Sequence, residues 1–276
     1  IAASGKAGII ADMAHSHANP RTLATLILLG AMVIVFVLAG NWQLRRAAQR
    51  HATSEAIDNG RSLAPLHLSA KSPSSEFTNW RPVTAGGIWR NDLTVLLENR
   101  SFKGRTGYWV ATPLLLDGSP NTAVVVLRGW VPRPLGPGEK LMPIPSPQGL
   151  QTLSGQLINR VPRLFELWSI EHSTAGKLPA RLPLADHALP HVQNLDLKAY
   201  AQASGLTLLS TIVEQTSDSP DGFGREWPHA SLNASENIGY AMQWFTFAAI
   251  AAIAWLVTAM NALRRKRASR PPPAKV

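Results

Sequence analysis

Two long apolar runs without a charged residue constrain this chain more than any other feature. Residues 22–44 contain the sequence LATLILLGAMVIVFVLAG, and residues 237–263 contain GYAMQWFTFAAIAAIAWLVTAM. Each run is longer than the about 20 residues that a helix needs to cross a bilayer. A buried helix of a soluble protein is one alternative, and a cleaved signal peptide is another for the first run. The length, the uniform apolarity and the WQLRR sequence that follows the first run favour two transmembrane helices.

The distribution of charge predicts the orientation of the two spans. Of the 27 Lys and Arg residues, six lie in the segment 264–276, directly after the second span. Such clusters favour the cytoplasmic side of a membrane, whereas Arg45, Arg46 and Arg50 after the first span favour the opposite orientation. Because the tail carries more charge, we expect both termini in the cytoplasm. The predicted organisation is a cytoplasmic tail (1–21), a first span (22–44), an extracytoplasmic domain (45–236), a second span (237–263) and a basic cytoplasmic tail (264–276).

The charge of the segment between the spans bears on the class of partner. Residues 40–238 hold 19 basic and 16 acidic side chains, so this segment is close to neutral. A nucleic-acid-binding protein is expected to gather basic residues on a folded face. Here the basic excess is a tail that follows an apolar run, so we expect membrane lipid and membrane proteins as partners, and no nucleic acid.

The start of the chain carries two further expectations. The sequence opens with Ile1, and Met13 begins the segment that leads into the first span. We expect Met13 to be the natural start and residues 1–12 to be an upstream extension. No Arg- and Ser-rich presequence precedes the first span, which favours a bacterial inner membrane over a mitochondrial one.

The segment between the spans shows the pattern of a mainly antiparallel, barrel-like β domain with little helix. Short β-type runs alternate with turn residues. They cover residues 83–89, 94–99, 108–116, 123–130, 153–158 and 207–214. The run AVVVL at 123–127 is apolar throughout, as in a strand buried on both faces. One helix is predicted at 196–204, stopped by Gly205, and the region 163–191 is expected to be irregular.

Motifs for catalysis or metal binding are missing from the sequence. The chain has no cysteine, which excludes disulfides, iron–sulfur clusters and cysteine nucleophiles. It contains no GxGxxG, P-loop, HExxH or GxSxG pattern. His15 and His17 are expected to belong to a tail, and Pro190 breaks the helical spacing of His187 and His191. We therefore expect a protein that is not an enzyme and holds no metal through its own ligands.

Arginines and aromatic residues at strand ends are the remaining candidates for a site. Arg100 ends the run LLENR, and Arg128 begins the run RGWVP. Ordinary packing of arginine stems on tryptophan faces is one interpretation. The other is bidentate binding of a cofactor's propionate groups, in which case removing the charge would cost the ligand without unfolding the domain.

Several long motifs in a fixed order resemble the surfeit locus 1 family. They are NWQLRR after the first span, RPVTAGGIW (81–89), LLENRSFKGRTGYWVATPLLL (96–116), VVVLRGWVP (124–132) and GYAMQWFTFA (239–248), followed by the basic tail. The resemblance extends from about residue 40 to residue 267, and the region 163–190 matches poorly. It implies an assembly factor for haem-copper terminal oxidases, chiefly cytochrome c oxidase. The implied partners are the catalytic subunit of the oxidase and other assembly factors.

The resemblance also implies a role with haem a, as a transient cofactor that is inserted into, or protected in, the catalytic subunit. Bacterial members are linked to haem a through a histidine three residues before the tyrosine of a Tyr-Ala-x-x-Trp motif. Here that tyrosine is Tyr240 and the matching position holds Asn237, which is not a usual ligand of haem iron. The candidate haem a contacts that remain are Trp244, Tyr240, Arg100, Arg128 and His229.

Other functions compete with the haem-related one. A scaffold could stabilise an oxidase intermediate by contact alone, and Asn237 favours this alternative. An extracytoplasmic sensor and an enzyme acting on haem are less favoured. The alanines of the second span (248, 249, 251, 252 and 254) offer a seam of small residues for the first span or for an oxidase helix.

Overall fold

The computed structural model describes residues 20–136, 138–164, 176–227 and 234–268. The chain divides into two compact units, one of residues 1–53 with 231–276 and one of residues 54–230. Within the described residues, the elements follow the order α1, β1 to β6, β7, α2, β8 and α3, with short 3-10 turns at Ser74–Glu76 and Asn91–Leu93.

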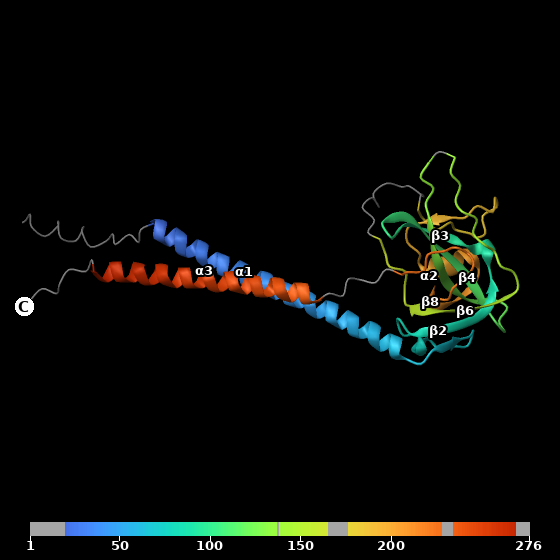
Figure 1. Cartoon of the computed structure of the whole chain (residues 1–276), viewed down its shortest axis with the longest axis horizontal. Helices are drawn as coiled ribbons and strands as arrows, with labels where there is room; N and C mark the ends of the chain where they lie inside the picture. The colour runs from blue at the N-terminus through green and yellow to red at the C-terminus, as the bar shows by residue number, and fades with distance from the viewer. Residues whose placement is uncertain (1–19, 137, 165–175, 228–233, 269–276) are drawn as a thin grey trace, which may run out of the picture. The chain divides into compact units, whose positions relative to one another are not determined.

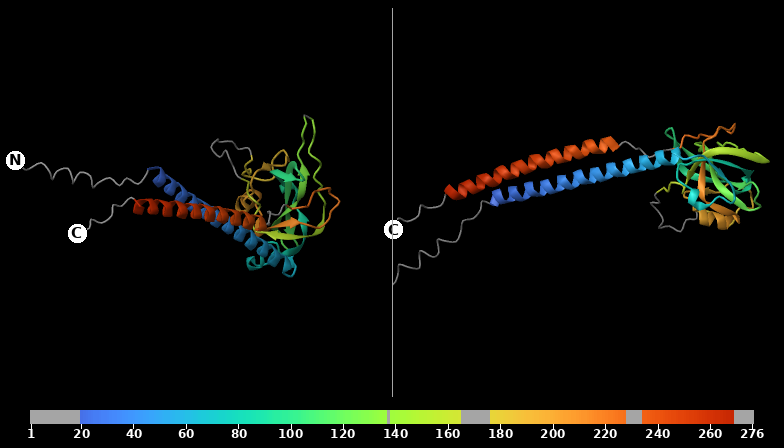
Figure 2. Two further views of the ribbon diagram at one scale, coloured as in Figure 1. Left: turned by 60° about the vertical axis from the view of Figure 1, so that its left-hand side comes forward. Right: turned by 90° about the horizontal axis from the view of Figure 1, so that it is seen from below.

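The first unit contains two long helices that lie side by side (Figures 1 and 2). Helix α1 spans Pro20–Ser62, its last turns belonging to the second unit, and α3 spans Ala234–Ala268. Both contain a stretch that is long and apolar enough to cross a membrane. Large apolar side chains such as Ile27, Ile34 and Ile253 are more than half exposed, as expected of a lipid-facing surface.

The second unit is built on an eight-stranded sheet within the described residues. The strand order is β1-β2-β6-β8-β5-β4-β3-β7, and most neighbours are antiparallel. The strands are β1 (Leu66–Leu68), β2 (Pro82–Trp89), β3 (Val95–Phe102), β4 (Arg105–Leu116), β5 (Thr122–Pro132), β6 (Leu150–Ile158), β7 (His191–Val192) and β8 (Thr207–Gln215). The predicted mainly antiparallel β domain between two candidate spans is confirmed.

Strand β2 pairs with β6 over most of its length. Its last residues, Gly87, Ile88 and Trp89, also pair with β4. The pairings β2–β6–β8–β5–β4 therefore return to β2, and we call these five strands the strand ring. Gly87 permits the closure, because a Cβ atom there would lie 2.2 Å from the carbonyl oxygen of Leu115. The sequence predicts a barrel-like domain. The closed set of pairings agrees with that shape, but the structure assigns a sheet and not a barrel.

Alternating side chains of β5 explain why its apolar run has no polar member. Val124 and Val126 belong to one apolar cluster with residues of β1, β2, β4, β6 and β8. Ala123, Val125 and Leu127 belong to a second cluster with Tyr200 of helix α2. The strand is thus buried on both faces, as predicted.

Helix α2 (Leu197–Ser204) confirms the helix expected at 196–204. Its N-cap, Asp196, accepts hydrogen bonds from the backbone amides of Lys198 and Ala199. Its C-cap, Gly205, has the left-handed conformation at φ 71° that favours glycine. Both signals are local, which is why the sequence predicts the helix ends correctly.

Candidate functional site

The face of α1 that packs on α3 follows a heptad pattern. On α1 the positions that are less exposed recur as Val33, Phe36, Gly40, Gln43 and Ala47. On α3 they recur as Asn237, Ala241, Trp244, Ala248 and Ala251. This spacing is typical of two helices that pack along a continuous seam. Small residues in such a seam allow the helix backbones to approach closely.

Only part of the predicted alanine seam lies in this contact. Ala248 and Ala251 are 6% and 5% exposed, whereas Ala249 is exposed. Ala252 and Ala254 are half-buried. Because α3 has 3.6 residues per turn, alanines at adjacent positions cannot share one face. Ala248 and Ala251 are therefore the members of the predicted seam that are buried within the first unit.

Asn237 is a buried polar residue of this seam. Its side chain is 8% exposed, and its Nδ2 donates a hydrogen bond of 2.6 Å to Oε1 of Gln43 on α1. Its own Oδ1 has no partner among the described residues. An amide held in this way links the two helices and offers no imidazole nitrogen for a haem iron. The residue at this position does not fit axial ligation of haem.

The other predicted residues of α3 differ in their surroundings. Trp244 lies in an aromatic cluster, tilted against Phe36 at a centroid distance of 5.7 Å and edge-on to Phe247 at 6.2 Å. Tyr240 is 56% exposed. The third candidate near the span, His229, lies outside the described residues. Helix α3 therefore directs Asn237 and Trp244 toward α1, whereas Tyr240 is exposed.

Arg100 sits at a β-bulge and holds three segments of the second unit together. The pairing of β3 with β4 shifts register between Leu97 and Arg100. The buried guanidinium donates to the carbonyl oxygens of Pro162 (2.9 Å) and Gln193 (3.2 Å) and lies 4.6 Å from the ring of Trp109. Burial lowers the pKa of Arg100 to about 10, so it stays charged at neutral pH. These contacts account for Arg100 as a structural residue.

Arg128 lies in the register shift between β4 and β5. Val110 pairs with Gly129 and Ala111 with Leu127, so Arg128 is the extra residue of a bulge. Gly129 has φ 151°, and a Cβ atom there would lie 2.6 Å from Cβ of Phe223. The bulge thus lets the chain turn Arg128 inward while Phe223 approaches the backbone.

The side chain of Arg128 packs on aromatic rings. It is 2% exposed, and its guanidinium carbon lies 5.0 Å from the ring of Trp89 and 5.4 Å from that of Phe223. Each such contact stabilises a cation by about 0.5–2 kcal/mol. Leaving a buried charge without a partner costs several kcal/mol. The rings alone do not offset the burial of this charge.

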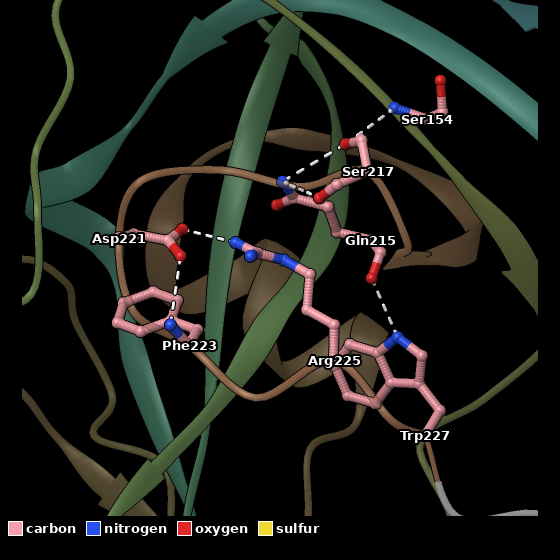
Figure 3. A network of polar contacts seen from close by, with 7 residues as sticks. All are labelled: Ser154, Gln215, Ser217, Asp221, Phe223, Arg225 and Trp227. Carbon is pink, nitrogen blue, oxygen red and sulfur yellow. Dashed lines mark hydrogen bonds and ion pairs between the residues drawn. The ribbon is translucent and has the colours of Figure 1, made fainter.

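A polar network lies beside Phe223, in the segment after β8 (Figure 3). Arg225 donates to Oδ2 of Asp221, and Oδ1 of Asp221 accepts from the backbone amide of Phe223 (3.2 Å). Gln215 donates to Ser217, and Trp227 donates to the carbonyl oxygen of Gln215 (2.9 Å). This network folds the segment back onto β5, where Gly224 and Trp130 exchange backbone hydrogen bonds.

Burial lowers the pKa of Arg128; Asp221 opposes this shift and Arg225 adds to it. No pattern in the sequence predicts a site role for Asp221, Arg225 or Gln43. Only Gln43 lies in a family motif, NWQLRR, so a signal existed for that residue alone.

An open groove of about 520 Å³ lies elsewhere on the second unit, between the end of β6, α2 and β8. Arg160, Arg163 and Lys198 line it together with Leu197 and Leu208. Arg163 forms an exposed ion pair with Asp196 at 3.8 Å. The groove contains none of the predicted site residues.

These features define a class: a candidate membrane-anchored protein with a β domain between two apolar helices. The sequence profile of the SURF1 family matches residues 30–249, which is most of the chain. The chain belongs to the SURF1 family. Uncharacterized SURF1-like proteins of Mycobacterium bovis and Mycobacterium tuberculosis are 28% identical over 258 residues, which cover 91% of this chain and 88% of theirs. The resemblance seen in the motifs is thereby confirmed.

Proposed function

We propose that this chain is a membrane-anchored assembly factor for a haem-copper terminal oxidase. It aids the insertion of haem a into the catalytic subunit, or stabilises that subunit during insertion. Membership of the SURF1 family, which is associated with oxidase assembly, supports the proposal. The family is one of assembly factors and not of a known enzyme class, so the proposed activity is binding and not catalysis.

The hydrogen bond between Asn237 and Gln43 bears on whether the protein assists the oxidase by binding haem a or by contact alone. Where the resemblance implies a histidine, this chain has an amide that bonds across the helix pair. This favours the second candidate function, in which the protein stabilises an oxidase intermediate by contact and does not bind haem. In the first candidate function, haem a binds transiently through a ligand other than residue 237.

An absorption spectrum of the detergent-purified chain, made in cells that also make haem A, separates the two. A stoichiometric haem a band in the wild type indicates direct binding through another ligand. A colourless wild type, with haem bound on changing Asn237→His, indicates a contact-only assembly factor. Ile238→His is the matched control, because it adds an imidazole at the next position of α3, where the side chain is 47% exposed.

Both candidate functions require that the oxidase needs this protein for its assembly. We expect that deleting this chain lowers the amount of assembled oxidase with haem in its catalytic subunit, and that the two proteins co-purify. Normal oxidase levels and haem content in the deletion strain would contradict both candidate functions.

A further inference from the structure

The guanidinium of Arg128 donates no hydrogen bond to a described residue, and two of its three nitrogens, Nε and Nη1, are shielded from solvent. Arg100 is the internal comparison, because its guanidinium, which is also buried, donates to two carbonyl oxygens and leaves only Nε without a partner among the described residues. Buried polar groups in native proteins nearly always have a partner, so each exception calls for an explanation.

The one carboxylate that influences Arg128 is already engaged. Both oxygens of Asp221 are used, by Arg225 and by the amide of Phe223, as Figure 3 shows. The side chains of Arg225 and Asp221 are 10% and 4% exposed. Among the described residues, this cluster therefore contains two buried cations, Arg128 and Arg225, and one buried anion, Asp221, which leaves one positive charge without a counter-charge.

We propose that Arg128 is the anchor of a carboxylate-binding site at this end of the strand ring. The aromatic rings of Trp89 and Phe223 contact the guanidinium, which leaves its N–H groups to donate in the plane of the fork. A planar carboxylate accepts in that plane and supplies the missing charge. The site lies in the second unit. Binding of a small carboxylate there does not rest on the proposed oxidase role, whereas binding of an acidic side chain of an oxidase subunit or assembly factor does.

The segment 140–145, which packs against the apolar cluster of Phe223, is held mainly by side chains. Leu141, Met142 and Ile144 pack against the cluster that contains Phe223. Among the described residues, no backbone hydrogen bond ties residues 140–145 to a strand. Opening these apolar contacts gives a ligand access to Arg128 without breaking the sheet.

The carboxylate has two possible sources, a small organic acid or an acidic side chain of a partner protein, and two arms of one experiment distinguish them. The first arm measures the melting temperature of the full chain in detergent, with sodium propionate compared with sodium chloride at equal ionic strength. For a ligand well above its dissociation constant, a shift of a few degrees is expected. Arg128→Met should abolish the shift, and Arg160→Met, an exposed arginine of the groove, should retain it.

The second arm places a photo-crosslinking residue at Met142 in cells that make the oxidase. A crosslink to an identified oxidase subunit or assembly factor, lost in Arg128→Met and kept in Arg160→Met, indicates a protein carboxylate. A propionate shift without such a crosslink indicates a small acid.

The proposal fails if wild-type protein shows neither the shift nor the crosslink. It fails also if Arg128→Met melts well below the wild type in carboxylate-free buffer while propionate has no effect on the wild type, because Arg128 is then a structural residue. If Arg128→Met does not fold, the wild-type titration and Arg128→Lys, which keeps the charge without the planar fork, provide the test.

Discussion

Arg100 and Arg128 show how differently two buried arginines can be used. Arg100 follows a β-bulge, Arg128 is the extra residue of another, and both contact a tryptophan ring. Arg100 donates to carbonyl oxygens of two distant segments, whereas Arg128 has no acceptor among the described residues. The expectation that either arginine can lose its charge without unfolding the domain therefore applies to Arg128 alone.

We predict that Arg100→Met destabilises the second unit. The substitution removes two hydrogen bonds from a charged donor, to the carbonyl oxygens of Pro162 and Gln193, and the cation that lies over Trp109. This loss should lower the free energy of unfolding by about 2–4 kcal/mol. Urea unfolding of the full chain in detergent, followed by tryptophan fluorescence, measures the change. Arg105→Met, at an exposed position of β4, is the control and should change stability by less than about 0.5 kcal/mol. Equal midpoints for both variants would contradict the structural role of Arg100.

At the scale of elements, the packing of α1 on α3 depends on Gly40. A Cβ atom at this position would lie 2.7 Å from the ring of Phe245, so a larger side chain must displace that ring or separate the helices. Gly239 on α3 has no atom within 4 Å of such a Cβ and serves as the matched control. The two glycines separate the effect of helix contact from that of helix propensity.

We predict that Gly40→Val loosens the helix pair and that Gly239→Val does not. Because the chain has no cysteine, Gln43→Cys with Asn237→Cys provides a single pair of thiols where the two side chains meet. A short bis-maleimide should join them in the parent protein, and Gly40→Val should lower the yield severalfold. An unchanged yield would show that the contact with Phe245 does not set the helix separation.

At the scale of the whole molecule, the charge of the tails predicts the orientation in the membrane. Six basic residues follow the second span and three follow the first, so we expect cytoplasmic termini. Alkaline phosphatase, which is active only outside the bacterial cytoplasm, should be inactive when fused after residue 276. It should be active when inserted after Leu135, an 82% exposed residue of the loop after β5. The reverse pattern would overturn the orientation.

The sequence predicts elements whose causes are local. Uninterrupted apolarity over more than a bilayer thickness predicts α1 and α3, and apolar runs between turn residues predict β2 to β6 and β8. The strands β1 and β7 escape prediction because each has only two or three residues, too few to form a pattern. Asp196 and Gly205 mark the ends of α2 through interactions with their own neighbours.

The candidate site is predictable in part. Motifs identify Arg100, Arg128, Trp244 and Asn237 as candidates. They do not show which residue each of these side chains contacts. Gln43 lies 194 positions from Asn237, and Gln193 lies 93 positions from Arg100. No periodic pattern connects residues so far apart.

The sequence by itself determines the two apolar helices, the strands between them and the membership of the SURF1 family, because each rests on residue types in local order. The tertiary structure alone decides that β2 closes the strand ring on β4 and that Asn237 bonds to Gln43. It also decides that, within the described part of the chain, Arg100 has acceptors while Arg128 has none. The physical reason is that a buried polar group is satisfied only by the atoms that folding places within hydrogen-bonding distance of it.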